Sequence, residues 1–443
     1  MLRPVTLLVC SGLALSVNAY AGPDSIVPGG QDPESPMAGF ANKSVDVWTE
    51  LDYAYELSSS RLFREVVDPN RDPLDGTRTV SDLEFKQFRH VLTPRVQVGV
   101  FRDTFLSAAL PIVIQQAREL RFDDPNGRPI SPTVRDGLIP MDGFDSNDPG
   151  TPTVGDLAFR GPTRRGLDQV HLGLGTAFMN QLKDDTKPTW KIGAEIRLAV
   201  GTVMKFDPMQ PNANKGVSRG VQELKVWTTF ARKLGWAEPW IELSWLVPLS
   251  DKSDSLFDDP GFGATNIAHS QQATVASGLE VYALDNRADE TRISIDIGSR
   301  VTAHFEGREY TEMWEVFALG GDTRLGGPLI LDSDPTDSEP DPVSHPGISN
   351  IENYLELTSR FGVRAQIGPH VRFAVLADLI WKTDHAISFA DAGVDNEDDN
   401  DLVNPGTDEV NPLHVQTIDL VGHRYRSIDG FDIVIGVSGQ VLF

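Results

Sequence analysis

The chain has 443 residues, and its 64 aspartates and glutamates outnumber its 39 lysines and arginines, which gives a formal net charge of −25. This balance argues against nucleic-acid binding, because phosphate contacts need clustered basic side chains. Hydrophobic residues make up 40% of the sequence, enough for a folded core. The absence of any run of about 18–20 apolar residues argues against a helical membrane protein. The single cysteine, Cys10, excludes a disulfide framework and a thiolate metal site.

The N-terminus has the pattern of an export signal. After a short basic start, the apolar residues 5–17 are too few to span a bilayer, and a small-x-small triplet ends at Ala21. We therefore predict a signal peptide over residues 1–21, cleaved before Gly22. A lipoprotein signal that uses Cys10 is the less favoured alternative.

The next segment, residues 22–44, is rich in proline and glycine and predicts an extended periplasmic leader or a small plug. From residue 45 to residue 443 the dominant pattern is alternation, as between Trp190 and Met204, where apolar even positions alternate with charged or small odd ones. Twelve segments show it: residues 45–58, 83–100, 104–118, 169–180, 189–205, 220–233, 238–249, 271–284, 291–306, 351–367, 370–383 and 428–443.

The connections between these segments alternate between short turns and long loops. Short periplasmic turns, long extracellular loops and an even number of strands are typical of an outer-membrane β-barrel. We therefore predict an all-β fold, a single antiparallel transmembrane barrel of about 12 strands over residues 45–443, in the cell outer membrane. A secreted β-sandwich would also alternate. The glycines and alanines on the charged faces, and the aromatic residues near segment ends, favour the barrel.

The last segment alternates regularly and ends the chain on Phe443. An amphipathic last strand with a terminal aromatic resembles the signature that the barrel-assembly machinery of Gram-negative outer membranes reads. This resemblance implies that machinery and outer-membrane lipid as partners, with Phe443 as the assembly signal.

A second resemblance concerns the first half of the chain. The stretch that begins at His90 reads HVLTPRVQVGVFRDTFLSAALPIVI, with paired strands, a tight turn and a strand-ending proline. It resembles outer-membrane transporters of the phenol meta-cleavage pathway type, which are grouped with long-chain fatty-acid transporters. The sequence VGDL from Val154 and the strand-like stretch from Trp190 are similar too, but Gly201-Thr202 replaces the family's Pro-Thr-Gly. The resemblance implies a barrel and solute transport, and no binding residues.

The charged faces must point into the barrel, because lipid cannot solvate them. The lumen-lining candidates are Arg89, Arg95, Arg197, Asp296, Arg300, Glu356, Arg360, Arg364, Arg372 and Asp378. They predict either a charged constriction that selects solutes or a ladder of cross-strand ion pairs that fills a narrow barrel. Four of the arginines, Arg300, Arg360, Arg364 and Arg372, fall on three consecutive predicted strands, and we expect one basic patch with a mild preference for anions.

One long loop contains the sequence REYTEMWEVFALGG from Arg308 to Gly321. It predicts a short helix capped by Thr311 and stopped by the glycine pair. Such a loop either folds into the barrel as a constriction or covers its mouth, and the cover is slightly favoured.

Two acidic runs, residues 332–341 and 391–409, lie in long loops. Solvated loops are the favoured interpretation, and Ca²⁺ or Mg²⁺ binding is the alternative; beyond this we expect no cofactor. No Ser-His pair with a defined spacing is visible, so we expect no enzyme. The sequence favours a porin-like channel or transporter for small solutes. The alternative is a non-conducting adhesion, scaffold or structural barrel that works through its acidic surface loops.

Overall fold

The computed structural model describes residues 46–67, 76–124, 127–181, 183–257, 268–286, 291–334, 336, 339–396 and 402–443. The predicted signal peptide, residues 1–21, and the predicted leader or plug, residues 22–44, lie outside the described residues.

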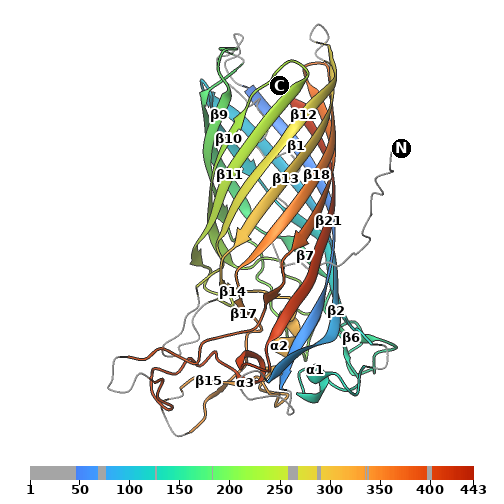
Figure 1. Cartoon of the computed structure of the whole chain (residues 1–443), viewed down its shortest axis with the longest axis vertical. Helices are drawn as coiled ribbons and strands as arrows, with labels where there is room; N and C mark the ends of the chain where they lie inside the picture. Colours follow the sequence, from blue (N-terminus) through green and yellow to red (C-terminus); the bar gives the residue numbers. More distant parts are fainter. Residues whose placement is uncertain are drawn as a thin grey trace, which may run out of the picture.

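Twelve antiparallel strands form one closed barrel (Figure 1). Each strand pairs with the next along the chain, and the last pairs with the first, so the wall has no free edge. In order around the wall they are β1 (Asp46–Val67), β2 (Thr77–Phe101), β3 (Thr104–Ala109) continued by β4 (Ile112–Phe122), β8 (Val170–Met179), β9 (Thr189–Leu198), β10 (Val221–Ala231), β11 (Ala237–Asp251), β12 (Gln272–Asn286), β13 (Thr291–His304), β18 (Tyr354–Ile367), β19 (Val371–Lys382) and β21 (Tyr425–Leu442).

All twelve predicted strands are present, and the predicted fold class is confirmed. The largest differences are at the extracellular end of the first hairpin, where β1 continues to Val67 and β2 begins at Thr77. Residues 59–67 have no regular polar alternation in the sequence, since the face that is buried there carries both Leu62 and Arg64. The third strand is interrupted at Pro111, which has no N–H to continue the ladder.

The prediction of a strand up to residue 205 was wrong, because β9 ends at Leu198. The chain then leaves the wall and crosses close to the β7–β8 connection. A Cβ on Gly201 would lie 2.1 Å from the carbonyl oxygen of Leu167, so only glycine allows this approach. After the crossing, Val203 and Met204 are buried inside the barrel end.

The apolar faces of the strands point outward. On β18, Leu357, Phe361 and Val363 are 45–51% exposed, whereas Arg360 between them is 5% exposed. A soluble sandwich would bury the apolar face, so this arrangement rules it out and defines a lipid-facing surface.

Aromatic side chains mark the two edges of that surface. Trp236 and Trp245 face outward at the two ends of the apolar band on β11 and are 67% and 48% exposed. Nine residues, 237–245, carry the chain from the first of these two tryptophans to the second. At about 3.3 Å per residue and a strand tilt of about 40°, they rise roughly 23 Å, which matches the height of the apolar band of an outer-membrane barrel. Other exposed aromatics near the two edges are Phe101, Phe178 and Phe443 at the periplasmic side and Phe305 and Trp381 at the extracellular side.

The remaining elements belong to the long connections at the extracellular end, opposite the C-terminus (Figure 1). They are α1 (Pro132–Arg135), β5 (Phe144–Asp145), β6 (Leu157–Arg160), β7 (Arg164–Leu167), β14 (Gly307–Glu309), α2 (Trp314–Gly320), β15 (Leu331–Asp332), β16 (Pro342–Val343), β17 (Ser349–Ile351), β20 (His385–Ala386) and α3 (Gln416–Asp419). Among the described residues, no helix has the length and apolar character needed to cross a membrane.

Candidate functional site

All ten predicted lumen residues lie on the inward-facing positions of their strands. In the half of the wall formed by β12 to β19 they form ion pairs. Arg360 donates Nε and Nη2 to the two oxygens of Asp378 at 2.8 and 2.6 Å. Arg364 reaches Glu280 and Asp296 at 3.3 and 3.1 Å. Each of these two arginines therefore has a carboxylate partner of its own.

The opposite half of the lumen is built in the same way. Arg89 on β2 lies 3.1 Å from Asp168 and 3.7 Å from Glu56. Arg95, also on β2, lies 3.8 Å from Glu50 across the β1–β2 pair. These contacts support the ion-pair ladder that the sequence predicts as one of its two alternatives.

Three other predicted residues have partners nearer the ends of the lumen. Arg197 donates Nε to Glu195 at 3.0 Å, and Glu356 lies 3.3 Å from the ammonium of Lys382. The guanidinium of Arg372 stacks on the ring of Trp48, 5.0 Å from its centroid.

The four arginines do not form one patch, which corrects that expectation. Arg300 and Arg372 lie level with positions 358 and 366 of β18, while Arg360 and Arg364 are on that strand. Positions 358 and 366 are eight residues apart on β18, so Arg300 and Arg372 are separated by roughly 20 Å along the lumen axis. Alternation in the sequence predicts which side chains point into the lumen. It does not predict strand register, which sets the height of each side chain along the lumen axis.

A half-open cavity lies in the periplasmic part of the lumen, and the unfilled space within it, together with the solvent at its mouth, is about 610 Å³. Its inner wall includes three small side chains at one level of the barrel, Ser294, Ala374 and Ser438, which leave space that larger residues would fill. The charged residues around it are Glu50, Glu280, Arg292, Arg364 and Arg372.

A small apolar layer lies in the lumen on the extracellular side of this cavity. Val91 and Val113 from the wall pack against Val217, which belongs to the β9–β10 connection and reaches inside the barrel. At the same level, Leu376 lies against Gly362, where a Cβ would be 2.1 Å from the leucine side chain.

Residues 310–321, which we call the plug, lie at the extracellular mouth of the barrel, buried among the extracellular ends of β1, β2, β4 and β21 and the surface loops (Figure 1). The plug contains α2, and every residue of this helix is buried. Phe317 packs edge-on against Tyr425 at the start of β21, and Arg118 of β4 lies 5.9 Å from the ring of Trp314. The predicted helix is confirmed, but Thr311 is not its cap: the N-cap is Met313, without a side-chain hydrogen bond.

Two buried ion pairs tie the plug and its base to the wall loops. Arg164 of β7 donates Nε and Nη2 to one oxygen of Glu315 at 3.2 and 2.7 Å, and its side chain is 0% exposed. The guanidinium also donates to the backbone carbonyl oxygens of residues 205 and 216 at 3.1 and 3.3 Å. Arg164 therefore joins the β4–β8 connection and the β9–β10 connection to the plug.

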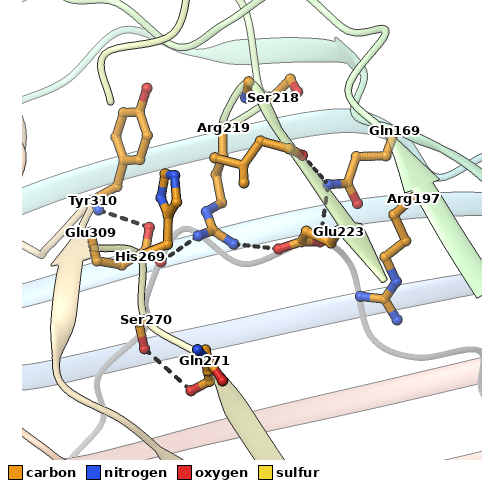
Figure 2. A network of polar contacts seen from close by, with 12 residues as sticks. Gln169, Arg197, Ser218, Arg219, Glu223, His269, Ser270, Gln271, Glu309 and Tyr310 are labelled. Atoms are coloured by element: carbon orange, nitrogen blue, oxygen red, sulfur yellow. Dashed lines mark hydrogen bonds and ion pairs between the residues drawn. The ribbon is translucent and has the colours of Figure 1, made fainter. Parts of the chain in front are cut away.

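The second ion pair is shown in Figure 2. Arg219, from the β9–β10 connection, donates Nη1 to Glu223 at 2.9 Å and Nη2 to Glu309 at 2.6 Å. Gln169 donates to the other oxygen of Glu223 at 3.1 Å. Burial raises the pKa of Glu309, and the neighbouring Arg219 offsets part of that rise.

Sequence reasoning did not single out Arg164, Arg219, Glu309 or Glu315. Arg164 lies in the short β7, and the other three lie in connections outside the barrel wall. Period-two alternation gives no information about residues in such connections. The one available signal was the run of arginines from residue 160 to 165 in a loop otherwise rich in acids.

Within the described residues, no group of three or more histidine, cysteine, aspartate or glutamate side chains is placed to hold a metal ion. Parts of both acidic runs, including residues 397–401, lie outside the described residues. Solvated acidic loops therefore stay the prediction, with Ca²⁺ or Mg²⁺ binding as the alternative.

A closed antiparallel barrel with an apolar outer face, aromatic edges and a charged interior is an outer-membrane β-barrel protein, and the chain is located in the outer membrane.

Its fold is similar to that of the COG4313 outer membrane channel from Pseudomonas putida F1, with 8% sequence identity, a TM-score of 0.40, and coverage of 95% of this chain and 100% of that chain. A Pseudomonas aeruginosa FadL homologue has 9% identity and a TM-score of 0.29, with coverage of 90% and 89%. The outer membrane protease OmpT from Escherichia coli has 8% identity and a TM-score of 0.28, with coverage of 93% and 99%. No protein-family model and no curated protein matches the chain.

Proposed function

We propose that this outer-membrane barrel is a channel for small solutes, closed in the present conformation by the plug. The observation that carries the proposal is the half-open cavity in the periplasmic part of the charged lumen, which is bordered by the small side chains of Ser294, Ala374 and Ser438. A solute that enters this cavity from the periplasmic end meets first the apolar layer and then the plug. Passage therefore requires the plug to move.

The way the plug is attached supports such a movement. β14 and β17 pair antiparallel at its base, with Glu309 opposite Ser349, so the plug is an insertion between two paired segments. The strands that flank it, β13 and β18, pair with each other from residue 292 to residue 304 of β13. The wall thus keeps its own hydrogen bonds when the plug leaves.

The test is single-channel conductance in a planar bilayer. Residues 310–348 are replaced by a short glycine-serine turn, which the pairing of Glu309 with Ser349 allows. The matched control removes residues 394–409 from the β19–β21 connection, where Gly393 and Val410 form a bridge. We expect rare openings from the wild type, sustained conductance without the plug, and wild-type behaviour from the control.

The second candidate is a non-conducting structural or adhesion barrel. It is favoured by the packed middle of the lumen, where buried ion pairs such as Arg360–Asp378 and the apolar layer around Val217 leave little room. If the variant without the plug is folded and still does not conduct, the channel proposal fails. Loss of cell-surface attachment on removal of residues 394–409 would then identify the acidic loop as the working part.

Under either proposal the partners are outer-membrane lipid and the barrel-assembly machinery, and under the first a small-molecule solute. We infer no catalytic reaction. Release of peptide or fatty acid by the purified barrel from model substrates would contradict that inference.

A further inference from the structure

Arg118, on the inward face of β4 beside the plug, has a buried guanidinium group whose hydrogen bonds are incomplete. The residue is 3% exposed, and its Nε donates to the side-chain oxygen of Gln87 at 2.6 Å. Its Nη1 and Nη2 atoms have no hydrogen-bond partner among the described residues. A buried charge with unpaired N–H groups is costly, so donors of this kind are normally paired with a bound ion or water.

Two further donors without a partner in the described part of the chain lie near this guanidinium. Trp314 of the plug is completely buried, its Nε1 is unpaired, and the centroid of its ring lies 5.9 Å from Arg118 Cζ. Gln116 precedes Arg118 by two residues on the same inward face of β4, is 2% exposed, and has an unpaired Nε2. The barrel wall and the plug therefore both contribute N–H groups to this position.

The charges around Arg118 leave these donors in a net positive environment. Glu315 is the carboxylate that acts on Arg118 most strongly, but it is hydrogen-bonded to Arg164 at 2.7 and 3.2 Å. Burial raises the pKa of Glu312, the other nearby carboxyl group, and so favours its neutral form. Arg89, the remaining neighbouring cation, has carboxylate partners of its own. Two guanidinium groups, those of Arg118 and Arg164, thus share the single charge of Glu315.

We propose that Arg118, Trp314 and Gln116 bind a small inorganic anion of the size of chloride, which joins the plug to the barrel wall. An anion accepts hydrogen bonds from all of these N–H groups and offsets the excess positive charge, whereas a water molecule offsets no charge. The side chains that would hold it are 0–3% exposed, which favours a small ion over a bulky one. The inference rests on the proposed channel function for its consequence, namely that the anion stabilises the closed position of the plug.

The first test locates the ion. Crystals of the full-length barrel are grown in sodium bromide and measured at the bromine absorption edge, because bromide replaces chloride and scatters anomalously. We expect an anomalous peak within hydrogen-bonding reach of the Arg118 guanidinium and Trp314 Nε1. Ordered water at this position without an anomalous peak would overturn the proposal.

The second test measures the stabilisation of the plug in solution. Amide hydrogen exchange of α2 is compared in sodium chloride and in sodium gluconate at equal ionic strength, since gluconate is too large for an enclosed site. An ion that binds only the closed plug reduces opening by the factor 1 + [Cl⁻]/Kd, so exchange should be about tenfold slower when chloride is at about ten times its Kd. Equal exchange in the two salts throughout a chloride titration would overturn the proposal.

Three substitutions separate the anion effect from a general effect of salt. Arg118→Met removes the charge and keeps the length of the side chain, and it should abolish the difference between chloride and gluconate. Trp314→Phe keeps an aromatic ring without the Nε1 donor and should raise the Kd for chloride about tenfold. Arg61→Met is the matched control, because this arginine is 44% exposed and paired with Asp429, and it should keep the full chloride effect.

Heat-modifiable gel migration shows whether each variant is folded, and if Arg118→Met is not, Trp314→Phe and the bromide map still decide the matter. A chloride effect that persists in folded Arg118→Met would overturn the proposal. The outcome does not depend on conductance. A barrel that binds bromide at this position but never conducts keeps the site and loses the channel, whereas a conducting barrel without bromide there keeps the channel and loses the site.

Discussion

Replacement of Glu315 by alanine tests whether the plug is a movable gate. The substitution leaves Arg164 buried without its carboxylate partner and removes two hydrogen bonds, at 2.7 and 3.2 Å. Breaking a buried ion pair by removing one partner costs about 3–5 kcal/mol. The contacts of Arg164 with backbone carbonyl oxygens remain and offset part of this, so the lower end of the range is the better expectation.

If this cost falls on the closed state, the equilibrium between open and closed plug shifts by about 10²–10⁴-fold, since about 1.4 kcal/mol is a factor of ten. The assay is open probability in a planar bilayer, together with amide hydrogen exchange of α2. Both should rise in Glu315→Ala. The double variant Arg164→Met with Glu315→Leu removes both charges and should open much less often, because it leaves no unpaired ion buried.

The exposed ion pair between Lys187 and Asp184 provides the control, and Lys187→Ala should change neither measurement. The reasoning is refuted if Glu315→Ala is folded and heat-modifiable, yet its open probability and the exchange of α2 equal those of the wild type. The plug would then be a fixed part of the barrel.

Four further predictions concern selectivity, pH, assembly and signal-peptide cleavage. Replacing Arg360 and Arg364 together by serine leaves their carboxylate partners uncompensated, so the reversal potential in a salt gradient should shift toward cations; an unchanged potential in a conducting variant would make these arginines structural. Burial lowers the pKa of His345 in the β13–β18 connection to about 3, so the unfolded loop takes up a proton below about pH 6.5 whereas the folded loop does not. The free energy of unfolding of the loop should be at its full value above that pH and should decline as the pH falls toward 3, by about 2 kcal/mol at pH 5. Hydrogen exchange should show that this pH dependence is flatter in His345→Asn. Deleting Phe443, whose backbone pairs with the start of β1, should reduce the heat-modifiable barrel recovered from outer membranes, and N-terminal sequencing should begin at Gly22; a lipid-modified N-terminus would contradict the cleavage prediction.

The wall of the barrel could be predicted from the sequence because its signal is local. A strand places successive side chains on opposite faces, so alternation from Trp190 to Leu198 or from Tyr354 to Ile367 identifies both a strand and its lipid-facing side. The same period identifies residues such as Arg360 and Asp296 as inward-facing, and lipid cannot accept them in any other position. The number of strands, their faces and the charged lumen therefore followed from neighbouring residues alone.

The interior of the barrel was decided by tertiary structure. Arg164 and Glu315 are 151 residues apart, and neither lies in an alternating segment of the wall, so no local pattern relates them. Whether the arginines of the lumen form a patch or lie at different levels depends on strand register, which long-range pairing sets. The space between Ser294, Ala374 and Ser438 exists because the register of three successive strand pairs brings these residues to one level. Alternation specifies which way a side chain points, but only closure of the barrel specifies which side chain it meets.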